Sequence, residues 1–494
     1  MDQNGGGNLR VATGIIGVST IIPALAVWCY MRQHHKGKQW LSETGIQRFA
    51  SNKATVFSLL YVDRLDSGRI GGACTMRCAD TGRDVDVKDL VDVPNLTLYS
   101  VEVVSGEVLL LFMEVPSVHD LFQLPFLDRG VRKVAKVGSH VYIARLDAVE
   151  KIPGLEPIHK RDVEGQRRVS IVWNTGRCGS TLMHRMLQRI GVISFSEPFW
   201  LDRVCELKRD GIKVDEVARA FGVCGAVDAT LTSRYLDGAP GLPDGPHLFG
   251  RGSVSFNVKG KGFKCMDAVV LSLPHARHIF MYRDLRKVVE SFCSIFASRP
   301  SALEKLLRRL LWWVPSWSRW QEFGPQQMMG GPRLVFSRAM AQARASGAIV
   351  EPSLPLAKVI CLSWMESMCM WKELNEDGAT ATHERTRLSI RMDDFVRKDP
   401  EVVRRVLGFV VGHRGEVDDA VVSEAMKAFE HNSQKGDRMS TSSFNPASRK
   451  PRVLTAQDIE EITAVTRAVP TIGSPDYMHP DSIWATAMSP TSLE

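Results

Sequence analysis

Apolar residues follow two different patterns along this chain. Between residues 55 and 149 they form short runs, TVFSLLYVD, ACTMRCADT, LTLYSVEVVSGEVLLLFMEV and SHVYIARLDAV, separated by polar or glycine-bearing stretches. Short runs bounded by turn-forming residues are typical of strands, and Ser105-Gly106 divides the third run as a hairpin turn does. The pattern predicts a small β-rich domain over residues 51–155, whose sequence contains no recognisable cluster of catalytic or metal-binding residues.

Beyond residue 165 the apolar pattern changes to strands alternating with amphipathic helices. The segment between the two patterns, residues 150–168 (EKIPGLEPIHKRDVEGQRR), is polar and proline-bearing, as linkers often are. Strands that alternate with helices are typical of a parallel sheet covered by helices. The sequence therefore predicts an α/β domain over residues 165–472, followed by a loose tail over residues 473–494.

The first apolar run, VATGIIGVSTIIPALAVWCYM at residues 11–31, contains no charged residue and is long enough to cross a bilayer once. A cleaved signal peptide is the alternative, because Ala24-Leu25-Ala26 could be a cleavage site. The apolar run continues past that tripeptide, and the residues before the run carry little positive charge. We therefore predict a retained transmembrane anchor at residues 11–31, between a tail at residues 1–10 and a polar stem at residues 32–50.

Charges beside this predicted anchor bear on its orientation. Arg32, Lys36 and Lys38 follow the anchor, whereas Arg10 before it is offset by Asp2. The positive-inside rule therefore places the C-terminal side in the cytoplasm.

Overall composition narrows the class of ligand. The net charge of +8 over 494 residues is modest and spread out, which favours an anionic small ligand over a long nucleic-acid track, so we expect no nucleic-acid partner. The ten cysteines are scattered, and Cys74 and Cys78 form the only close pair. We expect buried free thiols rather than a disulfide framework or a metal site.

The stretch NTGRCGSTLMHRML at residues 174–187 follows the apolar run VSIVW. Gly176 and Gly179 allow close approach of the backbone to a ligand, and the helix that starts near Ser180 offers unpaired N–H groups to an anion. The nucleotide-hydrolase pattern GxxxxGK[ST] needs a lysine where Gly179 stands. A phosphatase-type cysteine loop needs an arginine where His184 stands, so neither chemistry fits.

The loop Arg177-Cys178-Gly179-Ser180-Thr181-Leu182-Met183 resembles the [RK]-x-G-[ST]-T-x-[LW] loop of sulfotransferases. The resemblance implies that residues 177–182 cradle the 5′-phosphosulfate of 3′-phosphoadenosine 5′-phosphosulfate (PAPS), with no metal. An arginine suits that place because the leaving phosphate gains negative charge as the S–O bond breaks.

The same family has an arginine and a serine eight residues apart after a strand, where they grip the 3′-phosphate. HIFMYRDLRKVVES supplies Arg283 and Ser291 at that separation, although Leu285 stands where the family usually has proline. RLSIRMDDFVRKDPEVVRRVLG at residues 387–408 resembles a late structural strand and helix of the family. Lys435-Gly436 loosely resembles the basic loop that closes over the nucleotide, with a solvated polar loop as the alternative.

Two further residues are assigned by resemblance to the carbohydrate and tyrosyl-protein branches of the family. A glutamate after the second strand acts there as general base, and Glu197 occupies that place; the alternative is an ordinary carboxylate at a strand end. The cytosolic branch uses a histidine in a later segment, where this chain has SVSFNVKGKGFK. Lys259 in that segment is expected to bind the sulfuryl oxygens, unless the three lysines there form only a solvated turn.

LEKLLRRLLWWVPSWSRW at residues 303–320 holds four tryptophans. It could form a lid over a sugar acceptor, an interfacial helix on a membrane, or part of the packed core.

The sequence thus resembles a membrane-anchored sulfotransferase that uses PAPS. The family resemblance implies that the acceptor is a hydroxyl group of a carbohydrate. The resemblance favours a Golgi protein whose C-terminal side lies in the lumen. The charges beside the anchor favour a C-terminal side in the cytoplasm. A divergent nucleotide-dependent kinase and a non-catalytic nucleotide-binding scaffold are the alternatives. The oligomeric state is not determined by the sequence.

Overall fold

A computed structural model describes the greater part of the chain. The described residues are 40–41, 43–50, 52–62, 76–122, 124, 127–153, 155, 168–208, 211–237, 249–250, 252–258, 265–296, 337–347, 356–376, 386–412, 417–430, 454 and 456–467. Within them the strands form two separate five-stranded sheets, one antiparallel and one parallel.

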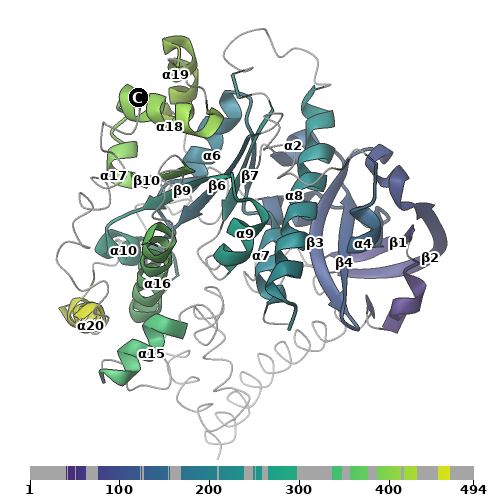
Figure 1. Cartoon of the computed structure of the whole chain (residues 1–494), viewed down its shortest axis with the longest axis horizontal. Helices are drawn as coiled ribbons and strands as arrows, with labels where there is room; N and C mark the ends of the chain where they lie inside the picture. The colour runs from purple at the N-terminus through teal and green to yellow at the C-terminus, as the bar shows by residue number, and fades with distance from the viewer. Residues whose placement is uncertain are drawn as a thin grey trace, which may run out of the picture.

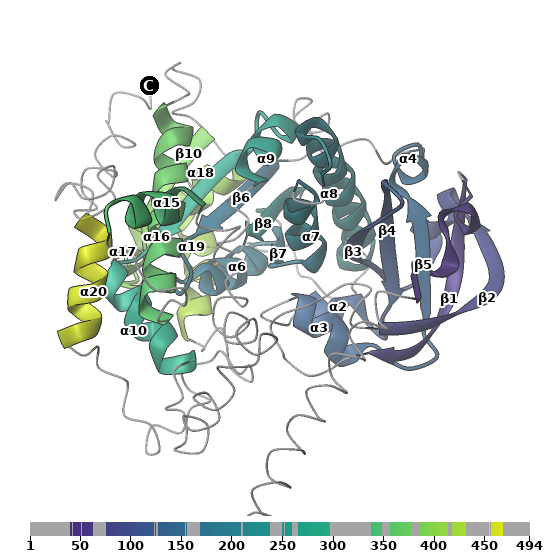
Figure 2. The ribbon, with the colours of Figure 1, turned by 90° about the horizontal axis from the view of Figure 1, so that it is seen from below.

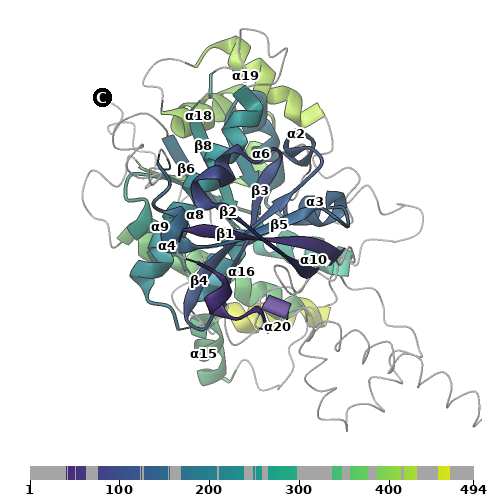
Figure 3. The same cartoon turned by 90° about the vertical axis from the view of Figure 1, so that its right-hand side faces the viewer.

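The first sheet is antiparallel, with strand order β2-β1-β5-β4-β3. Its strands are β1 (Lys53–Val62), β2 (Met76–Asp86), β3 (Leu96–Val104), β4 (Glu107–Glu114) and β5 (His140–Arg145). Short helices accompany them: η1 (Ile46–Arg48), η3 (Val87–Asp92), α2 (Val118–Phe122), α3 (Leu127–Val134) and α4 (Leu146–Val149). Figure 3 views the molecule from the side on which this sheet lies.

The predicted hairpin turn is confirmed. Ser105 and Gly106 join β3 to β4, and both have positive φ, 51° and 82°. Positive φ at both central residues is the backbone of a type I′ turn, whose twist matches that of paired strands.

Part of the segment predicted as a polar stem is buried against this sheet. Leu41 and Phe49 are 4% and 2% exposed, and the rings of Trp40 and Phe57 meet edge to face with centroids 5.2 Å apart. Apolar side chains within a largely polar segment caused the difference, because burying each of them removes its apolar surface from water.

The second sheet is parallel throughout, with strand order β10-β9-β6-β8-β7. Its strands are β6 (Arg168–Asn174), β7 (Ile193–Ser196), β8 (Ser253–Val258), β9 (Arg277–Tyr282) and β10 (Arg387–Arg391). The predicted parallel sheet with flanking helices is therefore confirmed. These strands are buried on both faces, which agrees with their nearly continuous apolar sequence.

Helices cover both faces of the parallel sheet (Figure 1). One face packs against α6 (Ser180–Arg189), α17 (Met392–Phe395), α18 (Pro400–Val411), α19 (Asp419–Met426) and η8 (Lys427–Glu430). The other face packs in a larger cluster with α7 (Phe199–Leu207), α8 (Val214–Asp237), α9 (Met266–Ser272), α10 (Leu285–Phe296), α15 (Ser337–Ala345), α16 (Leu356–Glu376) and α20 (Ala456–Arg467).

The strand order has a topological switch point between β6 and β9. The chain leaves β6 toward β8 and β7, whereas it leaves the neighbouring β9 toward β10 on the opposite side. Open parallel sheets bind ligands outside the carboxyl ends of two such strands, because the loops that follow them diverge there. The fold therefore favours a site formed by the loops after Asn174 and Tyr282.

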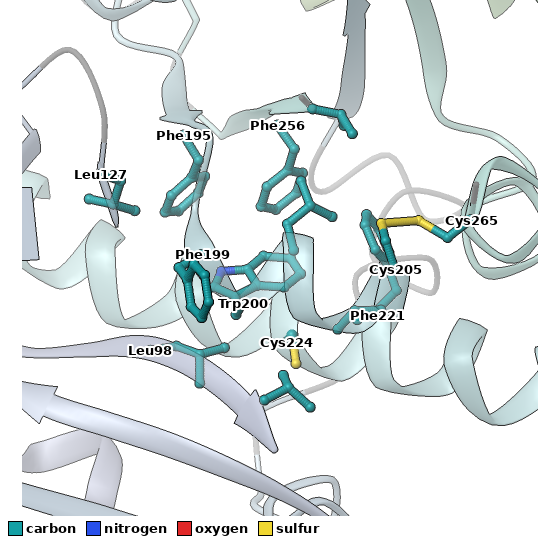
Figure 4. Packing of buried hydrophobic residues seen from close by; sticks show 14 of the residues in the cluster. Leu98, Leu127, Phe195, Phe199, Trp200, Cys205, Phe221, Cys224, Phe256 and Cys265 are labelled. Carbon is teal, nitrogen blue, oxygen red and sulfur yellow. A yellow bond between two sulfur atoms is a disulfide. The ribbon is translucent and has the colours of Figure 1, made fainter. Parts of the chain in front are cut away.

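The two sheets share one continuous core. Helices α7 and α8 lie between them, and both contact β3 (Figures 1 and 2). In Figure 4, Leu98 of β3 lies on the same side of the packed cluster as Phe199 of α7, and Trp200 lies close to Phe256 of β8. The rings of Trp200 and Phe256 are 5.7 Å apart. Aromatic side chains of this size make large contributions to packing, so the two sheets form one buried unit in the described chain.

One cysteine prediction is wrong. Cys205 of α7 and Cys265, just before α9, form a disulfide with their Cα atoms 5.0 Å apart (Figure 4), whereas the sequence predicted free thiols. The two residues are 60 positions apart, and only the packing of α7 beside α9 brings them together. Cys78, Cys178, Cys224 and Cys361 are described as free thiols, as predicted.

The predicted membrane anchor at residues 11–31 lies outside the described residues. Among the helices that are described, none combines the length and apolar character needed to span a bilayer.

Candidate functional site

The loop after β6 has the conformation that its glycines allow. Gly176 and Gly179 have φ of 79° and 84°, and Gly179 is the residue that precedes α6. A Cβ atom on Gly176 would lie 2.9 Å from the ring of Phe292, so the close approach of α10 also requires glycine there. The backbone N–H of Thr175 donates to the carbonyl of Met281 in β9 (3.1 Å), which joins the loop to the neighbouring strand.

The first turn of α6 follows this loop directly. Ser180 and Thr181 are buried at its start, and Leu182 is half-buried. The N–H groups of a first helical turn lack intrahelical partners, and together with the helix dipole they attract an anion. Cys178 is fully buried, and burial raises the pKa of its thiol to about 12, so it is a packing residue and not a nucleophile.

The residues predicted to hold the two ends of the nucleotide lie together. The Nε of Arg177 donates to the Oγ of Ser291 in α10 over 3.0 Å, although the two residues are 114 positions apart. The Nη1 of Arg283 lies 3.5 Å from the carbonyl oxygen of Arg177. Arg177, Ser291 and Arg283 therefore meet at the carboxyl ends of β6 and β9, at the switch point that the strand order defines.

The other contacts of Arg283 leave part of its guanidinium available. Its carbonyl oxygen accepts a hydrogen bond from the indole Nε1 of Trp364 in α16 (2.9 Å), which fixes the backbone just after β9. Its Nε is buried and has no hydrogen-bond partner among the described residues. A buried guanidinium N–H without a partner is costly, so this position is suited to an anionic ligand.

The electrostatic environment beside Arg283 is positive. Asp393 accepts a hydrogen bond from Lys287 over 2.8 Å. Burial alone would raise the pKa of Asp393, but this hydrogen bond and the charges of Lys287, Arg391 and Arg283 lower it below its ordinary value. The lowered pKa of this carboxylate indicates that several cations lie at one end of the sheet.

Glu197 stands at the carboxyl end of β7 in a strained backbone. Its φ is 53°, and Arg177 has a similar φ of 54°. A left-handed conformation costs a non-glycine residue roughly 1–2 kcal/mol and is concentrated at functional sites. The remaining described non-glycine residues with positive φ are in turns: Asn95, Ser105 and Lys398. The strained residues Arg177 and Glu197 thus stand at two strand ends of the same sheet edge.

A pair of asparagines connects these strand ends, and sequence reasoning missed both. The Nδ2 of Asn174 donates to the Oδ1 of Asn257 (3.0 Å) and to the carbonyl of Val258 (2.6 Å). The Oδ1 of Asn174 accepts from the N–H of Gly176 (3.0 Å), and the carbonyl of Asn257 accepts from the N–H of Glu197 (3.2 Å). The sequence signal that could have indicated this pair is an asparagine near the end of each of two apolar strands.

Several residues predicted from the sequence lie outside the described part of the chain. They are Lys259, Lys435, Gly436 and the tryptophan-rich residues 303–320. Their roles stay predictions.

No group of three or more His, Cys, Asp or Glu side chains within the described ranges could hold a metal ion. The residues that do converge, Arg177, Ser291 and Arg283, are hydrogen-bond donors that suit phosphate or sulfate oxygens.

No protein-family model matches this chain, and no curated protein matches it. Among solved structures, the sulfotransferase domain from the Synechococcus PCC 7002 olefin synthase is similar at 15% sequence identity and a TM-score of 0.28. The similarity covers 62% of this chain and 94% of that domain. A TM-score this low assigns no function to this chain.

Proposed function

We propose that this protein is a sulfotransferase that moves the sulfuryl group of PAPS to an acceptor hydroxyl. The observation that carries the proposal is the meeting of Arg177 with Ser291 and Arg283 at the carboxyl ends of β6 and β9. One nucleotide with phosphates at its 3′ and 5′ positions needs two anion-binding elements within its own length. The resemblance to sulfotransferases assigns one element to residues 177–182 and the other to Arg283 and Ser291.

The loop residues perform the electrostatic part of the reaction. Arg177 and the first N–H groups of α6 stabilise the negative charge that grows on the 5′-phosphate as the sulfur–oxygen bond to it breaks. Arg283 and Ser291 hold the 3′-phosphate and thereby fix the orientation of the donor for in-line attack. Cys178 packs beneath the loop and takes no part in the chemistry.

Glu197 acts as the general base in this proposal. Its carboxylate takes the proton of the acceptor hydroxyl as the acceptor oxygen forms its bond to sulfur. The hydrogen bond from its N–H to Asn257 holds the strained backbone at the end of β7, on the same sheet edge as the loop. Lys259, Lys435 and Gly436 complete the proposed site, with Lys259 at the sulfuryl oxygens and the other two closing over the nucleotide.

The acceptor and the location are further parts of the proposal and rest on the resemblance to the membrane-anchored branch. The acceptor is a carbohydrate hydroxyl. Residues 11–31 anchor the protein in a membrane, and the Golgi is the proposed compartment.

Calorimetry tests the donor site. The full chain is titrated with PAPS, with 3′,5′-bisphosphoadenosine and with ATP plus magnesium. The proposal expects the first two nucleotides to bind and ATP to bind more weakly. Tight binding of magnesium-ATP alone would establish the kinase alternative.

Transfer of labelled sulfate from PAPS to a panel of carbohydrates tests the reaction. The Glu197→Gln variant should bind PAPS like the wild type but lose most of the transfer rate, because general-base catalysis contributes roughly 100- to 10,000-fold. Donor binding without any labelled product would identify the non-catalytic scaffold instead.

A further inference from the structure

Two buried polar atoms lie side by side next to Glu197. Ser196 of β7 and Asn257 of β8 are paired across the parallel strands, and each residue is 2% exposed. The Oγ of Ser196 and the Nδ2 of Asn257 have no hydrogen-bond partner among the described residues. A buried polar atom left without a partner costs about 1–3 kcal/mol, so a neighbouring pair calls for an explanation.

The orientation of the Asn257 amide follows from its neighbour. The Oδ1 of Asn174 is occupied by the N–H of Gly176, so Asn174 presents its Nδ2 to Asn257. Asn257 must accept this hydrogen bond with its Oδ1, because two NH₂ groups that face each other cannot form a hydrogen bond. The Nδ2 of Asn257 is thereby turned away from Asn174.

The alternation along β8 places this pair on the side of α6. Val254, Phe256 and Val258 belong to the core cluster of the opposite face, so Asn257 faces the same side as Val172, which packs in the cluster of α6. Asn257 lies beside the carboxyl end of β6, where the loop before α6 begins. Its carbonyl accepts a hydrogen bond from the N–H of Glu197. The two unpartnered atoms are therefore located between the nucleotide loop and the proposed base.

We propose that the Nδ2 of Asn257 and the Oγ of Ser196 together bind an oxygen of the transferring sulfuryl group. This inference rests on the proposed function and adds two residues to it. Both atoms can donate a hydrogen bond, and a sulfuryl oxygen accepts. Because the Oδ1 of Asn257 is held by Asn174, the donor is already oriented before the ligand arrives, which spares the free energy of ordering it.

The test compares two nucleotides that differ only by the sulfuryl group. PAPS and 3′,5′-bisphosphoadenosine are titrated by calorimetry into the full-length wild type and the Asn257→Asp variant. Aspartate keeps an oxygen for Asn174 but replaces the donor with a negative charge. The affinity for PAPS should fall about 10- to 100-fold, the loss expected for a hydrogen bond to a charged group, while that for the bisphosphate should fall less, because only the repulsion by the new charge acts on it.

Ser196→Ala is the second variant, for the case that Asn257→Asp does not fold; it should lower the affinity for PAPS about 3- to 10-fold and spare the bisphosphate. Ser255→Ala is the matched control. Ser255 is also fully buried with an unpartnered Oγ, but it stands two residues earlier on the same face of β8, and neither affinity should change.

The outcomes separate the inference from the proposed function. If both nucleotides weaken equally in the Asn257→Asp and Ser196→Ala variants, or if neither weakens, the sulfuryl contact is overturned and the donor site remains. If the wild type binds neither nucleotide, the proposed function fails and the inference fails with it.

Discussion

Both sheets of this protein contain buried hydroxyls that are hydrogen-bonded, but they differ at the carboxyl edge of the parallel sheet. In the antiparallel sheet, Thr55 donates to the carbonyl of Arg48, and Ser100 donates to Glu102. At the carboxyl edge of the parallel sheet, the Nδ2 of Asn257 and the Oγ of Ser196 are buried without partners in the described chain. Satisfied polar groups stabilise a fold, whereas unsatisfied ones at a strand-end crevice are suited to a ligand. The comparison thus agrees with the proposal that the ligand binds at the parallel sheet.

The largest effect is expected where the antiparallel sheet meets α7. Arg203 donates to the carbonyl of Val101 (3.2 Å) and to Glu102 (3.5 Å), and both charged side chains are buried. Replacing Arg203 with Met removes a buried cation from Glu102 and from Glu206, to which Arg203 also donates. The free energy of unfolding in urea should fall by about 3–5 kcal/mol.

The matched control is Arg234→Met. Arg234 of α8 also bridges toward the antiparallel sheet, through Asp92 at 2.9 Å, but that pair is exposed. This replacement should lower the free energy of unfolding by less than about 1 kcal/mol. Equal losses in the two variants would show that burial does not distinguish these ion pairs.

A second prediction concerns Asp228 of α8, between the sheets. The indole Nε1 of Trp200 donates to its Oδ2 (2.7 Å), but burial outweighs this hydrogen bond and raises the pKa of Asp228 to about 7 from its ordinary value of 3.8. The folded protein therefore keeps a proton that the unfolded chain releases. The contribution of Asp228 to the free energy of unfolding should fall as pH rises from about 4 through 7, whereas that of His184 and His278, whose pKa values burial lowers to about 3, should rise over the same range.

The Asp228→Asn variant should lack this pH dependence. It should be more stable than the wild type at pH 8 by at most about 4 kcal/mol, and the difference should vanish near pH 4. Unfolding in urea across this pH range provides the measurement. Asp267→Asn is the control, because Asp267 forms an exposed ion pair with Lys208. A stability difference between the wild type and Asp228→Asn that does not change over the range would contradict the prediction.

The third prediction tests the parallel sheet from its two ends. Arg283 follows β9 at the carboxyl edge, whereas Arg277 at the start of β9 donates to the carbonyl of Phe409 in α18 (2.7 Å). Arg283→Gln should weaken binding of 3′,5′-bisphosphoadenosine about 10- to 100-fold, since one charge-assisted contact is lost. Arg277→Gln should leave the affinity unchanged. Calorimetry on both variants measures the two affinities. An equal loss of affinity would show that the two ends of β9 do not differ in nucleotide binding.

The smallest effect is expected at Cys178. Its thiol is buried and its raised pKa keeps it protonated, so iodoacetamide at pH 8 should leave it unlabelled in the native protein. The same reagent should label it in guanidinium, as mass spectrometry can verify. Rapid labelling of native Cys178 would mean that the loop opens readily and that its thiol is not a packing residue.

The sequence alone determined the elements and the residue types of the candidate site. Alternating and continuous apolar runs predicted the strands, and Gly176 and Gly179 predicted the sharp turn before α6, whose φ values agree. These features follow from neighbouring residues along the chain, because strand and turn preferences are local.

Tertiary structure alone decided which of these elements meet. The strand order β10-β9-β6-β8-β7 set Arg177 beside Ser291 and Arg283, and it paired Asn174 with Asn257. The disulfide between Cys205 and Cys265 and the shared core around Trp200 arose in the same way. Contacts between residues far apart in the chain depend on how whole strands and helices pack, and local sequence preferences carry no record of that packing.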